Sequence, residues 1–120
     1  MNPDPPPLAI SHLGDPGAAD HRLVIRGELD YMTAPDLTAA LGSLRLHSGS
    51  TLTLDLAGLG FCDSTGLSVL LGAHKRMASL GGKLTVSAID PNLARVLTIT
   101  GLAHLFTPVE TTGEPQGLGA

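Results

Sequence analysis

The apolar residues of this chain recur with two different spacings, which predict a series of strands and helices. Short apolar runs, in places alternating with polar residues, indicate strands at residues 8–13, 21–27, 52–56 and 83–89. Apolar positions three and four residues apart indicate helices from Thr33 to about Leu46, from near Ser64 to Gly81, and from Asp90 to Gly101. A last strand is expected at residues 105–109. After an opening pair of strands, the chain therefore alternates helices with strands.

Turn and capping residues set the expected boundaries of these elements. Asp15-Pro16-Gly17 is a turn signal, which predicts that the first two strands form an antiparallel hairpin. Thr33, with Asp36 three residues later, has the pattern of a capping box at the start of the first helix. Gly58 and Gly60 are expected to loosen a loop that follows the third strand.

The order of the elements, β-β-α-β-α-β-α with an expected final β, is that of a single α/β domain. Single helices between consecutive strands imply parallel neighbours, whereas the opening hairpin adds an antiparallel pair. We therefore expect a mixed sheet of four to five strands with three to four helices, spanning residues 8–110. Residues 1–7, which include four prolines, are expected to be a flexible head, and residues 111–120 a flexible tail.

Composition and charge narrow the classes of function. The 120 residues are 42% hydrophobic, which fits a globular fold, although only 2% are aromatic. The formal net charge is −4 and the chain contains no basic run, so nucleic-acid binding is not expected. Cys62 is the only cysteine, which excludes an internal disulfide and fits a reducing compartment. No apolar run is long enough for membrane insertion, so we expect a soluble, cytoplasmic protein.

Several catalytic signatures are incomplete in this sequence. The two glycines after the third predicted strand lack the third glycine of a dinucleotide fingerprint, and the five histidines show no metal-ligand spacing. A serine hydrolase is a weaker hypothesis, because Asp90 and His104 follow Ser64 in the order that such enzymes use. Cys62, however, stands where the hydrolase turn requires a glycine. We therefore expect a protein that is not an enzyme and needs neither a metal nor another cofactor.

Polar residues gather where two of the predicted strands end. Glu28 and Asp30 end the second strand, and Asp63, Ser64 and Thr65 open the helix after the third. Taken alone, such residues are better explained as caps and turns. The ends of neighbouring strands can nevertheless meet on one rim of an α/β sheet, where these residues would form an acidic surface for a basic partner. A phosphate on Ser64 would add about −1.5 to −2 charges there and block the contact.

Short motifs with a specific order and spacing run through the whole predicted domain. They are Gly27-Glu28-Leu29-Asp30, Thr33-Ala34, Asp63-Ser64-Thr65-Gly66-Leu67, Leu70-Leu71-Gly72, Gly81-Gly82-Lys83-Leu84 and Thr100-Gly101-Leu102. Together they resemble the anti-sigma-factor antagonists, which are single-domain STAS proteins. The resemblance covers roughly residues 8–110 and implies a STAS-like mixed sheet with helices. Cys62 departs from the pattern, because many members carry a larger apolar residue such as Met there.

The resemblance also implies a function. Ser64 matches the serine that a cognate anti-sigma factor, itself a serine kinase using ATP and Mg²⁺, phosphorylates, and a phosphatase removes the phosphate. The unphosphorylated protein would bind the anti-sigma factor and free a sigma factor for transcription. The expected partner-binding residues are Glu28, Asp30, Asp63, Thr65 and Gly66. The alternative is a constitutive STAS interaction subunit of a transporter or stress-sensing complex, in which Ser64 is only a helix cap.

Overall fold

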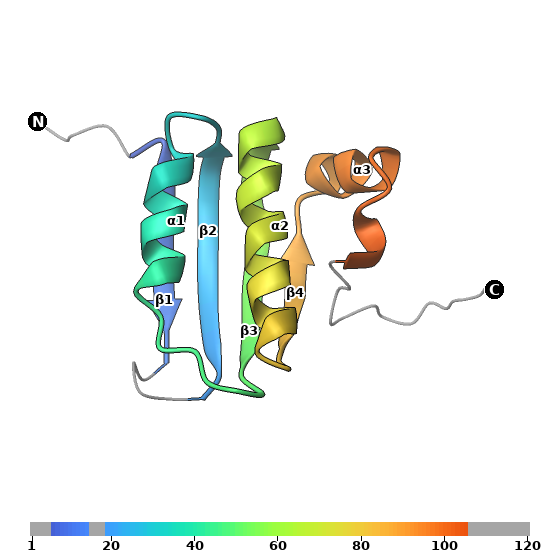
Figure 1. Ribbon diagram of the computed structural model, residues 1–120. Helices are drawn as coiled ribbons and strands as arrows, with labels where there is room; N and C mark the ends of the chain where they lie inside the picture. Colours follow the sequence, from blue (N-terminus) through green and yellow to red (C-terminus); the bar gives the residue numbers. More distant parts are fainter. Residues whose placement is uncertain (1–5, 15–18, 106–120) are drawn as a thin grey trace, which may run out of the picture.

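The computed structural model describes residues 6–14 and 19–105, which form a four-stranded sheet with three α-helices (Figure 1). The strands lie side by side in the order β1-β2-β3-β4. In chain order the elements are β1 (Leu8–Leu13), β2 (His21–Leu29), α1 (Ala34–Gly42), β3 (Thr51–Cys62), α2 (Ser64–Ser79), β4 (Lys83–Ile89), α3 (Pro91–Ile99) and the 3₁₀ helix η1 (Ala103–Leu105). The predicted mixed α/β fold is confirmed.

The pairing of the strands follows from how the chain connects them. β1 and β2 form the predicted antiparallel hairpin, with Ile10 opposite Ile25. β2 and β3 are parallel, and so are β3 and β4, because a helix returns the chain to the same end of the sheet between each pair. The carboxyl ends of β2 and β3 therefore meet at one edge, as expected for the predicted rim. The β2–α1 loop and the start of α2 both lie at this edge.

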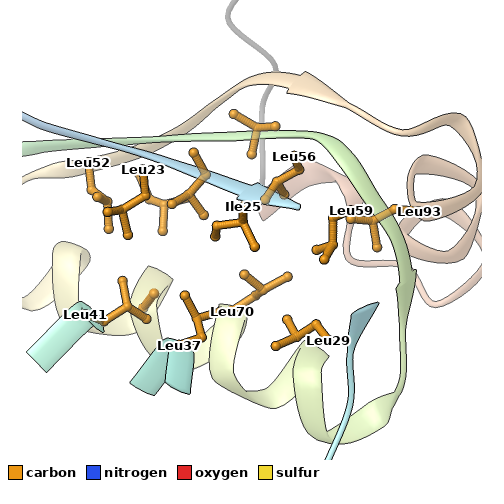
Figure 2. Packing of buried hydrophobic residues seen from close by; sticks show 14 of the residues in the cluster. Leu23, Ile25, Leu29, Leu37, Leu41, Leu52, Leu56, Leu59, Leu70 and Leu93 are labelled. Carbon is orange, nitrogen blue, oxygen red and sulfur yellow. The ribbon is translucent and has the colours of Figure 1, made fainter. Parts of the chain in front are cut away.

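Helices α1 and α2 lie side by side on one face of the sheet (Figure 1). Alternate residues of β2 and β3 point at these helices and are buried. Figure 2 shows Leu23, Ile25 and Leu52 of the strands directed toward Leu37 and Leu70 of the helices. Each buried leucine contributes roughly 1.5–3 kcal/mol relative to an exposed one, so a core composed mainly of leucine compensates for the scarcity of aromatic residues.

Strand β3 is longer than its alternating pattern predicts. It continues past Leu56 to Cys62, so Gly58 and Gly60 lie in a strand and the loop expected there is wrong. The pairing of β3 with β2 shifts register twice, and at each shift β3 has one residue more than β2. Such bulges interrupt the alternation of facing residues. The pattern therefore ends at Leu56 although the strand does not.

Helix α1 differs from its prediction at both ends. It ends at Gly42 rather than near Leu46. Thr33 occupies the N-cap position, but its backbone is in the helical region and its side chain makes no capping hydrogen bond. The predicted capping box with Asp36 is therefore wrong. The Thr33 hydroxyl instead donates to the Glu28 carbonyl oxygen at 2.8 Å, which ties the loop back onto β2.

The other boundaries agree with the predictions to within two residues as far as the structure describes the chain, β2 for example ending at Leu29 rather than Gly27. Asp90 caps α3, and Gly81, with φ of 70°, follows the end of α2 in the left-handed region that favours glycine. Leu105 belongs to η1, and the rest of the expected strand at residues 105–109 lies outside the described residues. Most of the expected head and the whole of the expected tail also lie outside them.

Candidate functional site

Asp63 fixes the start of α2 and therefore the position of Ser64. Its backbone is extended, and its Oδ1 accepts a hydrogen bond from the Gly66 N–H at 2.9 Å. Aspartate is favoured at such a cap, which stabilises a helix by about 1 kcal/mol. Ser64 is consequently the first residue of the helix, with an exposed side chain. Within residues 6–14 and 19–105, the Ser64 hydroxyl has no hydrogen-bond partner, so it is free for modification.

Gly66 lets the first turn of α2 lie directly against the end of β2. A methyl group on this buried glycine would lie 2.6 Å from Leu29 Cγ, 2.8 Å from the Leu29 carbonyl oxygen and 2.9 Å from Cys62 Sγ. Real Cβ atoms do not approach other atoms this closely. Gly66, which the resemblance placed among the partner-binding residues, is thus packed closely against this chain's own Leu29 and Cys62 and supports the site from beneath.

The β2–α1 loop is held by a dense set of hydrogen bonds centred on Asp30. Asp30 Oδ1 accepts from the N–H groups of Met32 and Thr33 at 2.9 and 3.0 Å. The Asp30 N–H in turn donates to the Thr33 hydroxyl at 2.9 Å. The Asp30 carboxylate is thus directed at its own loop, a role that short polar side chains favour in turns. Glu28 is exposed and lies opposite Phe61 in the sheet.

The β2–α1 loop and the start of α2 are joined through Asp63. Its Oδ2 accepts a hydrogen bond from the Tyr31 N–H at 3.2 Å, while its own N–H donates to the Leu29 carbonyl oxygen at 3.0 Å. The structure therefore brings Asp30, Asp63 and Ser64 to one rim, as predicted. Both aspartates, however, accept hydrogen bonds from the backbone. Their carboxylates are therefore less available to a partner than the sequence indicated.

Large apolar side chains, which the sequence did not indicate, are exposed in the two segments that lead to the rim, the β2–α1 loop and the end of β3. Tyr31 and Met32 are 70% and 69% exposed in the β2–α1 loop, and Phe61 is 51% exposed near the end of β3. We call the adjacent Tyr31 and Met32 the apolar patch. Large exposed apolar groups next to one another are typical of binding surfaces. Two adjacent large apolar residues in a loop between a strand and a helix were the available signal in the sequence.

An open groove extends from the apolar patch between α1 and α2. Its volume is about 500 Å³, and its lining is mainly apolar, from Tyr31, Ala34 and Pro35 on one side to Thr65 and Val69 on the other. Thr65, which the sequence placed on the partner-binding surface, is exposed and forms part of this lining. The groove adds a concave apolar surface beside the Ser64 hydroxyl.

Cys62 lies beneath the site, and its thiol is unreactive as a nucleophile at neutral pH. It is half-buried between Leu29 and the first turn of α2. Burial, with a smaller contribution from the Asp63 carboxylate, raises the pKa of its thiol from 9.0 to about 12. The thiol therefore stays protonated at neutral pH, and protonated thiols are poor nucleophiles.

A second cavity, of about 430 Å³, lies toward the other end of the sheet, where β2 begins. The rings of His12 and His21 stack along its wall, with His12 Nε2 2.9 Å from His21 Nδ1. His21 Nε2 lies 3.0 Å from the Arg45 carbonyl oxygen and must donate to it, because a carbonyl only accepts. Both nitrogens of the buried His21 are thus used within the fold.

The serine-hydrolase alternative fails on geometry. His104 lines a depression together with Ala78, near the carboxyl end of α2. Ser64 is at the other end of that helix, about 21 Å away at a rise of 1.5 Å per residue. Asp90, the third residue of the proposed triad, caps α3 by accepting from the Asn92 N–H at 2.8 Å. These residues therefore do not form a catalytic triad.

The described part of the chain has neither a metal-binding cluster nor a membrane-spanning helix. In residues 6–14 and 19–105, no three His, Cys, Asp or Glu side chains are placed to hold a metal ion. Over the same residues, none of the helices is both long and apolar enough to span a membrane.

Comparison with known proteins decides the family. Residues 15–108 match the sequence model of the family described as "Mlab, STAS domain". The chain belongs to the STAS domain family. This STAS domain is 33% identical over 98 residues to the anti-sigma-B factor antagonist of Listeria monocytogenes, covering 82% of this chain and 86% of that protein. It is 36% identical over 87 residues to the anti-sigma-B factor antagonist of Bacillus subtilis, covering 72% of this chain and 79% of that protein.

Solved structures agree with this assignment. A crystal structure of an anti-sigma factor antagonist from Mycobacterium paratuberculosis matches this STAS domain with a TM-score of 0.65 and 30% identity, covering 82% of this chain and 83% of that one. The unphosphorylated anti-sigma factor antagonist SpoIIAA matches with a TM-score of 0.64, covering 87% of this chain and 90% of that one. At 21% identity it shows the likeness of fold alone. The resemblance noted in the sequence is confirmed at the level of the family.

Proposed function

We propose that this STAS domain is an anti-sigma factor antagonist whose binding surface is the rim around Ser64. The observation that carries the proposal is the exposed, unbonded Ser64 hydroxyl at the start of α2, beside the apolar patch. Relatives at 33% and 36% identity are named anti-sigma-B factor antagonists. Binding of the anti-sigma factor at this rim would release a sigma factor for transcription.

Phosphorylation of Ser64 is the switch in this proposal. The anti-sigma factor acts as a serine kinase that holds ATP and Mg²⁺. The Ser64 Oγ attacks the γ-phosphorus, the bond to the β-phosphate oxygen breaks, ADP leaves, and the hydroxyl proton passes to a base of the kinase. The STAS domain is the substrate and supplies no cofactor. A phosphatase restores the hydroxyl, and the use of ATP places the cycle in the cytoplasm.

The surroundings of Ser64 explain why a phosphate there would end binding. The phosphate adds about −1.5 to −2 charges next to the Asp63 carboxylate and the apolar patch. The unpaired N–H groups at the start of α2 would stabilise that charge in the free protein. Against a bound partner the same charge must lose water next to the Asp63 carboxylate, which is costly. The phosphate therefore favours the free state over the complex.

Binding measurements with substituted proteins test the switch. We would titrate the cognate anti-sigma factor by calorimetry with the wild type, Ser64→Ala and Ser64→Asp. Ser64→Ala should bind within about twofold of the wild type, whereas Ser64→Asp should bind at least about tenfold more weakly, or 1.4 kcal/mol. Ser48→Asp is the matched control, because it adds the same charge at an exposed turn just before β3, at the other end of the sheet.

The acceptor is tested separately. After incubation with the anti-sigma factor, ATP and Mg²⁺, mass spectrometry should find one phosphate on Ser64 of the wild type and none on Ser64→Ala. A phosphate elsewhere, with Ser64 unmodified, would overturn the assignment of the acceptor. Equal affinity of wild type, Ser64→Ala and Ser64→Asp would refute the switch and favour a constitutive interaction subunit.

A further inference from the structure

The Asp63 carboxylate makes two contacts that belong to different parts of the fold. Oδ1 accepts from the Gly66 N–H at 2.9 Å and caps α2. Oδ2 accepts from the Tyr31 N–H at 3.2 Å, in a loop that is 32 residues away in sequence. The first contact is local to the helix and would form in any helix with this cap. The second is not needed for capping, and it joins two of the segments that surround Ser64.

The hydrogen bond from Tyr31 to Asp63 matters because, in the part of the chain that the structure describes, the other side-chain hydrogen bonds of the β2–α1 loop stay within that segment. Asp30 accepts from Met32 and Thr33, and the Thr33 hydroxyl donates to Glu28, all within the same short segment. These bonds shape the loop but do not fix its direction relative to α2. Among residues 6–14 and 19–105, the Tyr31 N–H is the group of this loop that donates to a side chain of another element. The distance from the exposed Tyr31 and Met32 side chains to Ser64 therefore depends on Asp63.

We propose that Asp63 is a positioning residue, which holds the Tyr31–Met32 loop in the arrangement that the partner recognises. This proposal rests on the proposed function and assigns to the binding surface a residue that acts through another segment. The apolar patch is then held at one place on the rim before the partner arrives, because the loop that carries Tyr31 and Met32 is bonded to the residue that precedes Ser64. Rigid presentation of aromatic side chains lowers the entropic cost of binding.

Replacing Asp63 with asparagine separates its two roles, capping α2 and bonding to the β2–α1 loop. Asparagine is as good an N-cap as aspartate, so its one carboxamide oxygen can still accept from the Gly66 N–H. Its second group is an NH₂, which only donates and would face the Tyr31 N–H, another donor. Asp63→Asn should therefore keep the helix cap and lose the tie to the loop.

Amide hydrogen exchange followed by NMR on the full chain tests the positioning without any partner. In Asp63→Asn, the Tyr31 amide should exchange at least about tenfold faster, and the Gly66 amide within about threefold of the wild-type rate. Asp90→Asn is the matched control, because Asp90 caps α3 through the Asn92 N–H and touches neither segment of the rim. It should leave the Tyr31 rate unchanged. Equal Tyr31 rates in wild type and Asp63→Asn would overturn the proposal.

Affinity for the anti-sigma factor tests the consequence for binding. Asp63→Asn should weaken binding by about tenfold and raise the KM for phosphorylation of Ser64 while kcat stays within about twofold, because the substitution alters recognition and not the transfer step. A double-mutant cycle with the Tyr31→Ala/Met32→Ala variant, which removes both side chains that Asp63 is proposed to position, distinguishes positioning from direct contact. In that background, Asp63→Asn should weaken binding by less than about threefold. A further tenfold loss there would show that Asp63 contacts the partner itself, which would overturn the positioning role.

The two proposals fail in different ways. If wild type and Ser64→Asp bind equally well, the switch is wrong whatever Asp63 does. If Ser64→Asp binds weakly as expected but Asp63→Asn binds like the wild type, the proposed function stands and the positioning role is refuted.

Discussion

Replacing Gly66 with alanine tests whether the site depends on close packing between α2 and β2. The added Cβ would lie 2.6 Å from Leu29 Cγ, 2.8 Å from the Leu29 carbonyl oxygen and 2.9 Å from Cys62 Sγ. The leucine side chain can shift, but the carbonyl oxygen belongs to β2 and cannot shift without disturbing the sheet. Overpacking of this kind costs roughly 1–3 kcal/mol, and the fixed oxygen places Gly66→Ala near the upper end, at about 3 kcal/mol.

The helix itself gains from the same substitution. Alanine is favoured over glycine within a helix by about 1 kcal/mol, so the free energy of unfolding of Gly66→Ala should fall by about 2 kcal/mol net. Gly72, in the same helix, provides the matched control, because nothing lies within 4 Å of an added Cβ there. Gly72→Ala should therefore be more stable than the wild type by about 1 kcal/mol.

Urea denaturation followed by circular dichroism measures both changes on the full chain. The two variants should differ by about 3 kcal/mol in the free energy of unfolding, with opposite signs relative to the wild type. By thermal melting, Gly66→Ala should lose about 10 °C and Gly72→Ala should gain about 5 °C, at 4–8 °C per kcal/mol for a domain of this size. If Gly66→Ala were as stable as the wild type, or if Gly72→Ala were destabilised, the packing argument would be refuted.

Two further predictions concern Cys62 and His21. At pH 8 the folded Cys62 thiol, with a pKa of about 12, should react with iodoacetamide about 1000-fold more slowly than the thiol in urea, whose ordinary pKa is 9.0; equal rates by mass spectrometry would contradict the burial. Because the pKa of the thiol is higher in the folded than in the unfolded protein, the unfolded thiol ionises first, and the free energy of unfolding falls as pH rises above 9. His21→Leu should cost about 2 kcal/mol in urea denaturation, because it leaves the Arg45 carbonyl oxygen without its buried donor; a larger loss for the exposed His12→Leu would refute that origin.

The features of the site that are local in sequence could be predicted. Asp63 and Ser64 stand where an apolar period of three and four residues begins, and caps follow local rules. The parallel order of β2 and β3 also followed from the helix that connects them, and this order places Asp30 and Ser64 on one rim. The family resemblance then identified Ser64 as the residue of interest.

The features that depend on distant contacts could not be predicted. The Asp63 side chain has two oxygens, and only the structure shows that the second accepts from Tyr31. The family resemblance places Gly66 among the partner-binding residues, but only the structure shows that it packs against Leu29 and Cys62. Thr33 has a capping pattern, yet its hydroxyl finds a better acceptor on β2, the Glu28 carbonyl. In each case a tertiary contact outweighed or extended a correct local rule.

The two bulges in β3 make the number of residues in this strand as important as their identity. Successive side chains of a strand point to opposite faces, so an insertion or deletion reverses every residue that follows. With both extra residues present, Cys62 points at α2 and Asp63 reaches the cap position. Deleting Gly58 or Gly60 would turn Cys62 away and misalign the helix start. Related chains can therefore exchange the residues between Leu56 and Cys62 more freely than they can change their count, and a gap placed there in an alignment would displace Ser64.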